Sequence, residues 1–476
     1  MKSHTTLLSM LILASASALL AAPAAKLSYP VVDTGQTRCY DSTKEIAYPK
    51  TGAAYAGQDA QYSGNAMRYT DNKDGTITDE VTGLIWEKTP DFKKRSWPDA
   101  AKHANALNLG GKTDWRMPTM KELFSIAHFE GNQHTKTPYL HSAFDFHWPT
   151  EADGGRDMDG QYWSSNKYLG TTMRSDQSAF GFNFADGRIK GYPVSGRKVG
   201  TLFLRCVRGK AYGENKFVDN KDGTISDNAT GLIWTQKTSA KSMDWPAALK
   251  YAEGRSFAGQ SDWRLPNIKE LQTLVDYDRA PDAKDKTKRG PAIDPIFKLT
   301  DNSAWCWSST THLETRGAYY VCFGKALSEW TYNGQKMDAH GAGAVRSDPK
   351  TGDASRFSEG HGPQGDQVRI KNYVLLVRGG AATPKTTGPK LLPASSTQRR
   401  RPQGGNEPQR PAPDSDDPRI SRFINRLDKN NDGKVSKAEF DGPSNHFGHL
   451  DKNSDGFISS DEAPSGPPQG GPPRRR

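Results

Sequence analysis

Turn residues and apolar residues alternate in a short pattern near the beginning of the chain. Residues 71–88 read DNKDGTITDEVTGLIWEK. The turn dipeptide Asp74-Gly75 precedes the β-prone residues 76–78, and a second turn precedes the apolar residues 83–86. This alternation predicts a hairpin that ends in a buried strand.

Two short helices are predicted after this hairpin. Pro98 fits the first turn of one helix, whose apolar residues recur at helical spacing. Those apolar residues are Trp97, Ala100, Ala101 and Ala104. Thr119 and Glu122 fit a capping box at the start of the next helix. With scattered strands at 180–184 and 202–207, this order predicts an α+β fold with an antiparallel sheet.

The whole arrangement occurs twice. Residues 219–236 read DNKDGTISDNATGLIWTQ and match residues 71–88 at 13 of 18 positions, 148 residues later. Further repeated pieces are Trp97-Pro98 with Trp245-Pro246, Asp114-Trp115-Arg116 with Asp262-Trp263-Arg264, and Trp163-Ser164-Ser165 with Trp307-Ser308-Ser309. Copies of about 150 residues are long enough to bury a core each. We therefore expect two tandem modules, at 38–210 and 213–380.

Several repeated residues have a structural explanation. The repeated tryptophans are predicted to pack in the core; they are Trp86, Trp115, Trp163, Trp234, Trp263 and Trp307. Arg116 and Arg264 are expected to pair with Glu122 and Glu270. The DNKDG segments resemble calcium loops, but Thr70 stands where a first-position Asp is needed. Hairpins stabilised by Asp side chains are the favoured interpretation, with metal binding as the alternative.

The N-terminus reads as an export signal. Lys2 precedes an apolar run at residues 7–20, and small residues at 21–25 offer a cleavage site after Ala24. The run is shorter than the roughly 20 residues that span a bilayer as a helix. We expect residues 1–24 to be a signal peptide, with an N-terminal anchor as the alternative and no later transmembrane segment. The mature protein is then periplasmic, on the cell surface or secreted.

Charge narrows the possible partners. The formal net charge of +11 favours acidic partners such as nucleic acid, acidic polysaccharide or an anionic membrane face. Export makes nucleic acid the least suitable of these. A role of the charge in solubility alone stays open.

Four cysteines occur, and an exported chain favours disulfides. The closing strand of the first copy contains Cys206, and the second copy has no cysteine at the matching position. Pairing within each copy predicts the disulfides Cys39–Cys206 and Cys306–Cys322.

These repeated motifs resemble the Lcl C-terminal domain family. The motifs are Asp-Gly-Thr-Ile-x-Asp, Thr-Gly-Leu-Ile-Trp, Asp-Trp-Arg-[Met/Leu]-Pro-x-x-Lys-Glu-Leu, Trp-Ser-Ser and a closing Val-Arg-Gly. The resemblance implies exported modules of C-type-lectin-like shape that bind sulfated polysaccharide. It supplies no site residues, because the sugar-binding triplets Glu-Pro-Asn and Trp-Asn-Asp are absent from the sequence. No catalytic residue is assigned.

One stretch is peculiar to the second copy. The closing strand lies 170 residues after its counterpart rather than 148, and the extra residues are placed at 338–368. This loop holds His340, Arg346, Asp348, His361 and Asp366 among many glycines. Long loops are often functional, so a ligand or metal site here is one hypothesis and a plain surface loop is the other.

The C-terminal region differs in composition from the two copies. Pro, Gly, Ser and Arg dominate residues 381–418, which predicts a disordered linker. Residues 419–463 are predicted to form a small α-helical EF-hand pair, and 464–476 a disordered basic tail. Breaks at Gly442-Pro443 and Pro464 shorten the exit helices, so a structural calcium module is favoured over a sensor that opens a groove.

Two twelve-residue loops supply the oxygen ligands that calcium prefers, with a glycine at the sixth position and a glutamate at the twelfth. The ligands of the first loop are Asp428, Asn430, Asp432, the Lys434 carbonyl, Ser436 and Glu439. The ligands of the second loop are Asp451, Asn453, Asp455, the Phe457 carbonyl, Ser459 and Glu462. The expected cofactor is therefore calcium.

The sequence supports three functional hypotheses. The first is an exported calcium-binding protein whose two lectin-like modules bind a surface or matrix ligand, such as an acidic glycan or a surface protein. Paired modules of this kind gain avidity. The second is an enzyme on a scaffold like that of the sulfatase-modifying enzymes, and the third is a calcium-dependent structural protein of the envelope. The first is favoured, because no nucleophile–base pair can be singled out.

Overall fold

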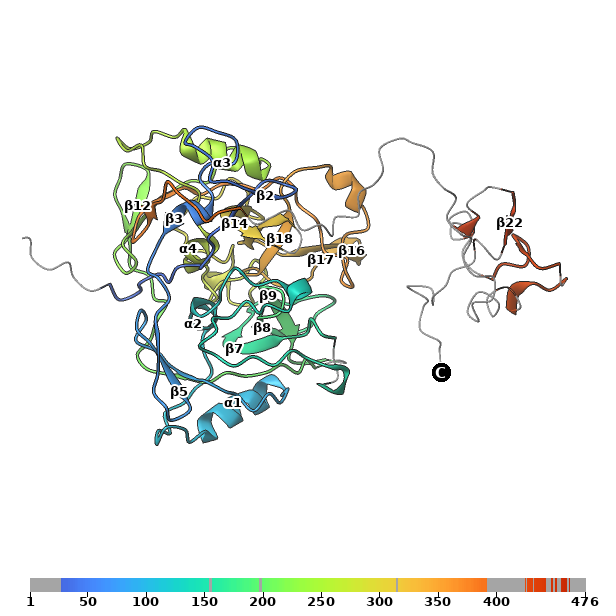
Figure 1. The fold of residues 1–476 in the computed structure, drawn as a ribbon, viewed down its shortest axis with the longest axis horizontal. Coiled ribbons are helices and arrows are strands. Elements are labelled where there is room, and N and C mark those ends of the chain that lie inside the picture. Colours follow the sequence, from blue (N-terminus) through green and yellow to red (C-terminus); the bar gives the residue numbers. More distant parts are fainter. Residues whose placement is uncertain are drawn as a thin grey trace, which may run out of the picture. The chain divides into compact units, whose positions relative to one another are not determined.

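The computed structural model describes residues 27–153, 156–196, 199–313 and 316–391 of the first unit, Met1–Pro393. In the second unit, Ala394–Arg476, it describes residues 424, 426–430, 432–441, 447, 450–451, 455–459 and 462. Figure 1 shows both units. The predicted signal peptide, most of the predicted linker and the predicted basic tail lie outside the described residues.

The first repeat contains a four-stranded sheet of order β10-β6-β5-β4, two helices and a three-stranded set. Its elements are β4 (Tyr69–Asp71), β5 (Thr76–Asp79), β6 (Ile85–Glu87), α1 (Trp97–Ala106), α2 (Met120–Ser125), β7 (Gln161–Lys167), β8 (Ser178–Asn183), β9 (Arg188–Pro193) and β10 (Val207–Arg208). The predicted hairpin is the pair β5–β6, in which Ile77 lies opposite Trp86.

The second repeat has the same order of elements and one additional hairpin, β16–β17. Its elements are β11 (Phe217–Asp219), β12 (Thr224–Asp227), β13 (Leu232–Thr235), α3 (Trp245–Glu253), α4 (Ile268–Thr273), β14 (Trp305–His312), β15 (Gly317–Cys322), β16 (Leu327–Tyr332), β17 (Gln335–Asp338), β18 (Val345–Pro349) and β19 (Val377–Gly379). The strands β11-β12-β13-β19 form the counterpart of the first repeat's four-stranded sheet.

A single six-stranded antiparallel sheet joins the repeats. Its order is β14-β15-β18-β9-β8-β7, so three strands come from each repeat. The junction is the pair β18–β9, where Val345 lies opposite Ile189. In Figure 1, β7–β9 of the first repeat lie beside β14 and β18 of the second. The two repeats are therefore fused through their sheets.

Burial on the two faces of this sheet follows the alternation of side chains along each strand. One face, with α2 and α4, forms a large core that includes Phe124, Phe182, Leu271 and Val321. The opposite face carries two smaller cores, one around Trp163 and one around Trp305 and Trp307. All six repeated tryptophans are buried, which confirms their predicted place in the core.

The predicted helix starts and ion pairs are confirmed. Thr119 and Glu122 form a capping box at α2, and Asn267 with Glu270 forms the same box at α4. Glu270 also accepts two hydrogen bonds at 2.6 Å from the guanidinium of Arg264. The equivalent pair in the first repeat joins Arg116 to Glu122.

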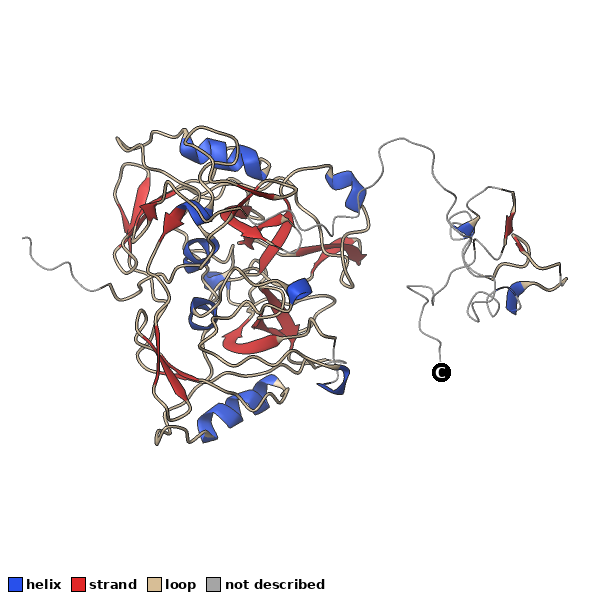
Figure 2. Ribbon diagram, in the orientation of Figure 1, coloured by secondary structure: helices blue, strands red, loops and turns tan. Residues whose placement is uncertain are grey.

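The predicted α+β fold class with lectin-like modules and a helical EF-hand pair was wrong. Among the described residues, strands far outnumber α-helices, of which there are only four short ones, the longest being α1 with 10 residues. Figure 2 shows how little helix accompanies the strands. Segments 161–193 and 305–349, where long loops and scattered strands were expected, are mostly strand because their small and aromatic residues pack on both sheet faces. In the described part of the tail, residues 424, 426–427, 447 and 450 are helical, and β21 (Val435–Ser436) and β22 (Phe457–Ile458) form a two-stranded sheet.

The N-terminal segment crosses to the second repeat. Gln36 donates from Nε2 to the carbonyl of Thr311 at 2.9 Å. In addition, β3 (Tyr62–Ser63) pairs with β20 (Thr383–Pro384), which lies in the predicted linker. Residues 36–63 thus complete the second repeat.

The predicted disulfides are not formed, since all four thiols are free and buried. Cys306 lies opposite Val321 and Cys322 lies opposite Trp305, so the side chains of the two cysteines point to opposite faces of the sheet. Cys39 lies with the crossing segment: its neighbour Tyr40 accepts a hydrogen bond from Lys350 of the second repeat. Cys206 belongs to a core of the first repeat. Burial also raises the pKa of all four thiols.

Candidate functional site

The first predicted calcium loop is held closed by its own carboxylates. Asp428 accepts hydrogen bonds from the N–H groups of Asp432, at 3.2 Å, and Gly433, at 2.8 Å. Glu439 accepts from the N–H groups of Lys429 and Asn430, at 3.0 and 3.2 Å. Both the first and the last carboxylate of the loop therefore point toward its interior.

The charge on the closing glutamate is favoured locally. The hydroxyl of Ser436 donates to Glu439 Oε2 at 2.6 Å, and the N–H of Ser436 donates to the same atom at 2.9 Å. These two bonds, together with those from Lys429 and Asn430, lower the pKa of Glu439 to about 2. Glu439 is therefore an anion at neutral pH, the form that binds a cation.

The second loop gathers three carboxylates. Oxygens of Asp451, Asp455 and Glu462 all lie within 4.8 Å of one another. Asp451 also accepts from Gly456 N at 3.0 Å, as Asp428 does from the equivalent glycine. Of the side-chain ligands predicted for this loop, Asn453 lies outside the described residues. A converging set of hard oxygen donors fits calcium.

The two loops are joined by a pair of short antiparallel strands, one from each loop. Val435 of β21 lies opposite Ile458 of β22, at the eighth position of each loop. Both residues are fully buried, in a small core with Ile424, Leu427 and Phe447. The same strand pair and the same small core therefore support both loops.

The DNKDG segments of the repeats are hairpins whose carboxylates are already paired. Asp71 Oδ2 lies 3.1 Å from the ammonium of Lys73 and 2.9 Å from that of Lys88. Asp74 accepts from the N–H and the hydroxyl of Thr76, at 3.0 and 2.6 Å. These contacts favour the hairpin interpretation over metal binding.

Four of the five residues selected in the 338–368 loop lie in buried surroundings. His340 Nε2 lies 2.7 Å from Asp366 Oδ1, and Arg346 pairs with the other oxygen of Asp366. Asp348 follows on β18, whereas the side chain of His361 is exposed. Burial lowers the pKa of His340 to about 4, so the imidazole is neutral at pH 7. This network braces the fold and offers no open binding surface.

The extra residues of the second repeat occupy two places. The hairpin β16–β17 stands between β15 and β18, and the remaining insertion follows β18. Trp330 and Tyr332 of β16 are 43% and 46% exposed. The guanidinium of Arg174 lies 5.6 Å from the centre of the Tyr332 ring. We call Trp330, Tyr332 and Arg174 the hairpin patch.

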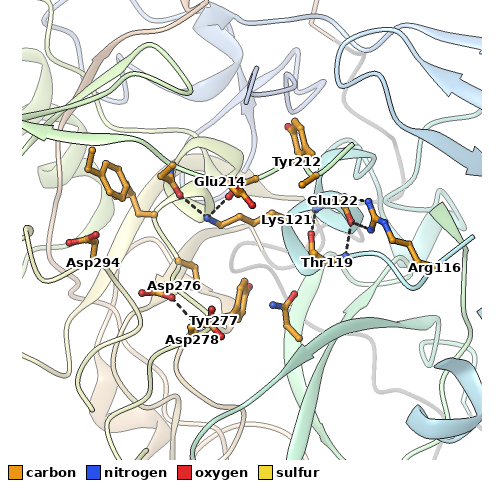
Figure 3. Close-up of a pocket in the computed structure, with 17 residues that line it drawn as sticks. Arg116, Thr119, Lys121, Glu122, Tyr212, Glu214, Asp276, Tyr277, Asp278 and Asp294 are labelled. Atoms are coloured by element: carbon orange, nitrogen blue, oxygen red, sulfur yellow. Dashed lines mark hydrogen bonds and ion pairs between the residues drawn. The ribbon is translucent and has the colours of Figure 1, made fainter. Parts of the chain in front are cut away.

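A cleft of about 630 Å³ lies where the repeats meet. Figure 3 shows Lys121 extended toward Glu214, with Asp276, Asp278 and Asp294 along the wall. Lys121 donates from Nζ to the carbonyl of Gly213 and to Asn215 Oδ1, at 3.0 and 2.8 Å. Burial lowers the pKa of Lys121 to about 8. The carboxylates outnumber the cations here, so this cleft is unsuited to an acidic polysaccharide.

A second cavity, of about 730 Å³, lies beside α3 in the second repeat. Its lining includes the buried Val374 and Leu376, and three cations stand at its rim: Lys237, Lys241 and Arg255. We call this cavity the α3 groove. Sequence reasoning missed it, because its residues are spread from position 222 to position 376.

Fusion through one sheet, a shared element order and paired oxygen-rich loops define a β-rich tandem-repeat protein with a separate C-terminal loop unit. A model of the Lcl C-terminal domain matches residues 75–208 and again residues 223–346, together more than half of the chain. The chain belongs to the Lcl C-terminal domain family, with two copies in tandem. No curated protein matches the chain significantly. Among the described residues, no helix has the length and apolar character needed to cross a membrane.

Proposed function

We propose that this family member is an exported calcium-binding protein whose two C-terminal loops each hold one calcium ion. The observation that carries the proposal is the convergence of the Asp451, Asp455 and Glu462 oxygens within 4.8 Å of one another. The anionic Glu439 and the inward-pointing Asp428 support the same role for the first loop. Calcium, when bound, supplies a fixed dication that holds each loop in one conformation.

The ligand oxygens come from the residues that the sequence placed at each loop position. In the first loop they belong to Asp428, Asn430, Asp432, Lys434, Ser436 and Glu439. In the second they belong to Asp451, Asn453, Asp455, Phe457, Ser459 and Glu462. The breaks at Gly442-Pro443 and Pro464 shorten the predicted flanking helices, so we expect affinities in the range of extracellular modules, roughly 10⁻⁴–10⁻³ M.

Replacing Glu462 by Gln is expected to weaken calcium binding to the second loop by about 10-fold or more, because the closing carboxylate loses its charge and its bidentate contact. Glu439→Gln is expected to do the same in the first loop. Both effects are measured by calorimetry as calcium is titrated into the full-length protein. The exposed Glu359→Gln in the first unit is the matched control. The same calcium titration for the wild type and for the double variant Glu439→Gln, Glu462→Gln would contradict the proposal.

We further propose that the repeats bind an acidic polysaccharide on a surface or in a matrix. The hairpin patch supports this, because exposed aromatic rings offer apolar faces to sugar rings and the adjacent Arg174 attracts anionic substituents. The net charge of +11 draws the protein toward such polymers. The acidic cleft of Figure 3 does not suit this ligand.

The double variant Trp330→Ala, Tyr332→Ala is expected to lower affinity for a sulfated polysaccharide such as heparin by about 30-fold, since stacking on each of the two rings contributes about 1 kcal/mol. Binding is measured with immobilised heparin, in calcium and again in chelator. Val218→Ala, which removes another exposed apolar side chain, is the control. Equal binding by the double variant and the wild type would contradict the proposal that the hairpin patch binds the polysaccharide.

A further inference from the structure

We infer that the α3 groove binds an amphiphilic organic anion, meaning an apolar ring or chain that carries a carboxylate, sulfate or phosphate group. This inference concerns a different surface from the calcium loops and the hairpin patch. It does not depend on either proposal being correct.

The groove has an apolar floor and aromatic walls. Val374 and Leu376 form part of the floor and are almost fully buried, with Met243 beside them. Tyr251 and Phe257 are half-buried in the wall. A cavity of about 730 Å³ with such a lining accommodates the apolar part of a drug-sized ligand.

Cations dominate the rim. No described carboxylate lies within ion-pair distance of Lys237, Lys241 or Arg255. The one carboxylate in the lining belongs to Asp222, and its Oδ1 accepts from the N–H and the hydroxyl of Thr224, at 2.9 and 2.6 Å. Three cations without a protein counter-ion favour an anionic group at the mouth of the groove.

The polar groups inside the groove are already used within the protein. The hydroxyl of Ser239 donates to the carbonyl of Lys241 at 2.9 Å and accepts from Val374 N at 3.1 Å. The hydroxyl of Thr235 accepts from Leu376 N at 3.1 Å. Few hydrogen-bonding groups remain for the many hydroxyls of a sugar. An apolar body with a single charged group suits the groove better than a polysaccharide.

The first repeat carries different side chains at the matching positions. Offset by 148 residues, Asp91 and Arg95 correspond to Ser239 and Met243. Asp91 and Arg95 form an ion pair with a hydrogen bond of 2.9 Å, where the second repeat has an uncharged pair.

Three further differences lie at the groove. Bulky Phe92 corresponds to Ala240, whereas Thr89 and Leu107 correspond to the cations Lys237 and Arg255. Relative to the first repeat, the second repeat has therefore lost volume and gained positive charge at the same place. The lost volume leaves room for an occupant, and the gained charge favours an anionic one.

Anilinonaphthalene sulfonate, an aromatic sulfonate whose fluorescence rises in apolar surroundings, is a suitable probe for the full-length protein. We expect saturable binding at one site, and binding about 10-fold weaker for phenylnaphthylamine, which has the same rings without the sulfonate. The double variant Lys237→Thr, Arg255→Leu carries the residues of the first repeat. It is expected to bind the sulfonate about 10-fold more weakly than the wild type does.

A steric variant provides the second arm of the test. Ala240→Phe places the first repeat's side chain at the groove and is expected to reduce binding of both probes. Lys216→Gln, an exposed lysine outside the groove, is expected to leave binding unchanged. Equal sulfonate binding by wild type and both groove variants would overturn the inference. Loss of heparin binding in the groove variants with unchanged sulfonate binding would also overturn it, because the groove would then be a polysaccharide site.

Discussion

Replacing Glu270 by Ala is expected to lower the free energy of unfolding by about 3–5 kcal/mol. The carboxylate of Glu270 accepts two hydrogen bonds at 2.6 Å from Arg264, and both side chains are only 6% exposed. It also accepts from Asn267 N at 3.0 Å, so it caps α4 at the same time. Its removal leaves a buried guanidinium without a counter-ion. Denaturant unfolding monitored by tryptophan fluorescence measures the change.

The first repeat supplies the control for this substitution. Glu122 pairs with Arg116 in the same geometry, but the Arg116 side chain is 35% exposed. Water can solvate this guanidinium when its partner is lost, so Glu122→Ala is expected to cost about 1–3 kcal/mol. Equal losses in the two repeats would contradict the argument from burial.

Replacing Asp338 by Asn is expected to change how stability depends on pH. Burial raises the pKa of Asp338 from 3.8 to about 7, although its side chain accepts hydrogen bonds from Tyr168, Ala326 and Gly341. The folded state therefore binds a proton at this site that the unfolded state releases between pH 4 and pH 7. The stability that this proton contributes is present below pH 4 and is lost as the pH rises through 7.

Asparagine resembles the protonated acid and does not titrate. The wild type is therefore expected to lose about 4 kcal/mol relative to Asp338→Asn between about pH 4 and pH 8, at about 1.4 kcal/mol per pKa unit. Unfolding curves of both proteins at several pH values measure this difference. Asp353→Asn alters an exposed carboxyl whose pKa is lowered, so it is expected to give a flat difference over the same range. A flat difference for Asp338→Asn would contradict the prediction.

Local features of the fold could be predicted from the sequence. The β5–β6 hairpin and the capping boxes at Thr119 and Asn267 depend on residues a few positions apart. The Arg264–Glu270 pair also lies within six residues. Each of these features is determined by short-range turn, cap or charge chemistry, and the duplication showed each of them twice.

Long-range features could not be predicted in this way. One residue pair, Val345 with Ile189, joins the two repeats into one sheet, and nothing in either strand alone indicates its partner. The crossing of residues 36–63 to the second repeat is equally non-local. The assumption that each copy was self-contained therefore led to the wrong cysteine pairing, with Cys39 assigned to the first repeat.

The candidate sites show the same contrast between short-range and long-range features. Residue spacing alone located the calcium loops, because their ligands are consecutive along the chain. The α3 groove could not be predicted from residue spacing, because Lys237, Arg255 and Leu376 come together only in the folded protein. A position-by-position comparison of the copies contains the relevant signal, in the changes from Phe92 to Ala240 and from Thr89 to Lys237.

The central claim is that the C-terminal loops bind calcium, and calorimetry on the full-length protein tests it most directly. After removal of metal with a chelator, calcium is titrated into the wild type and into the Glu439→Gln, Glu462→Gln double variant. We expect two ions to bind per chain in the wild type, with dissociation constants of roughly 10⁻⁴–10⁻³ M, and both sites of the double variant to bind at least about 10-fold more weakly. No binding heat in the wild type, or the same titration in both proteins, would contradict the claim.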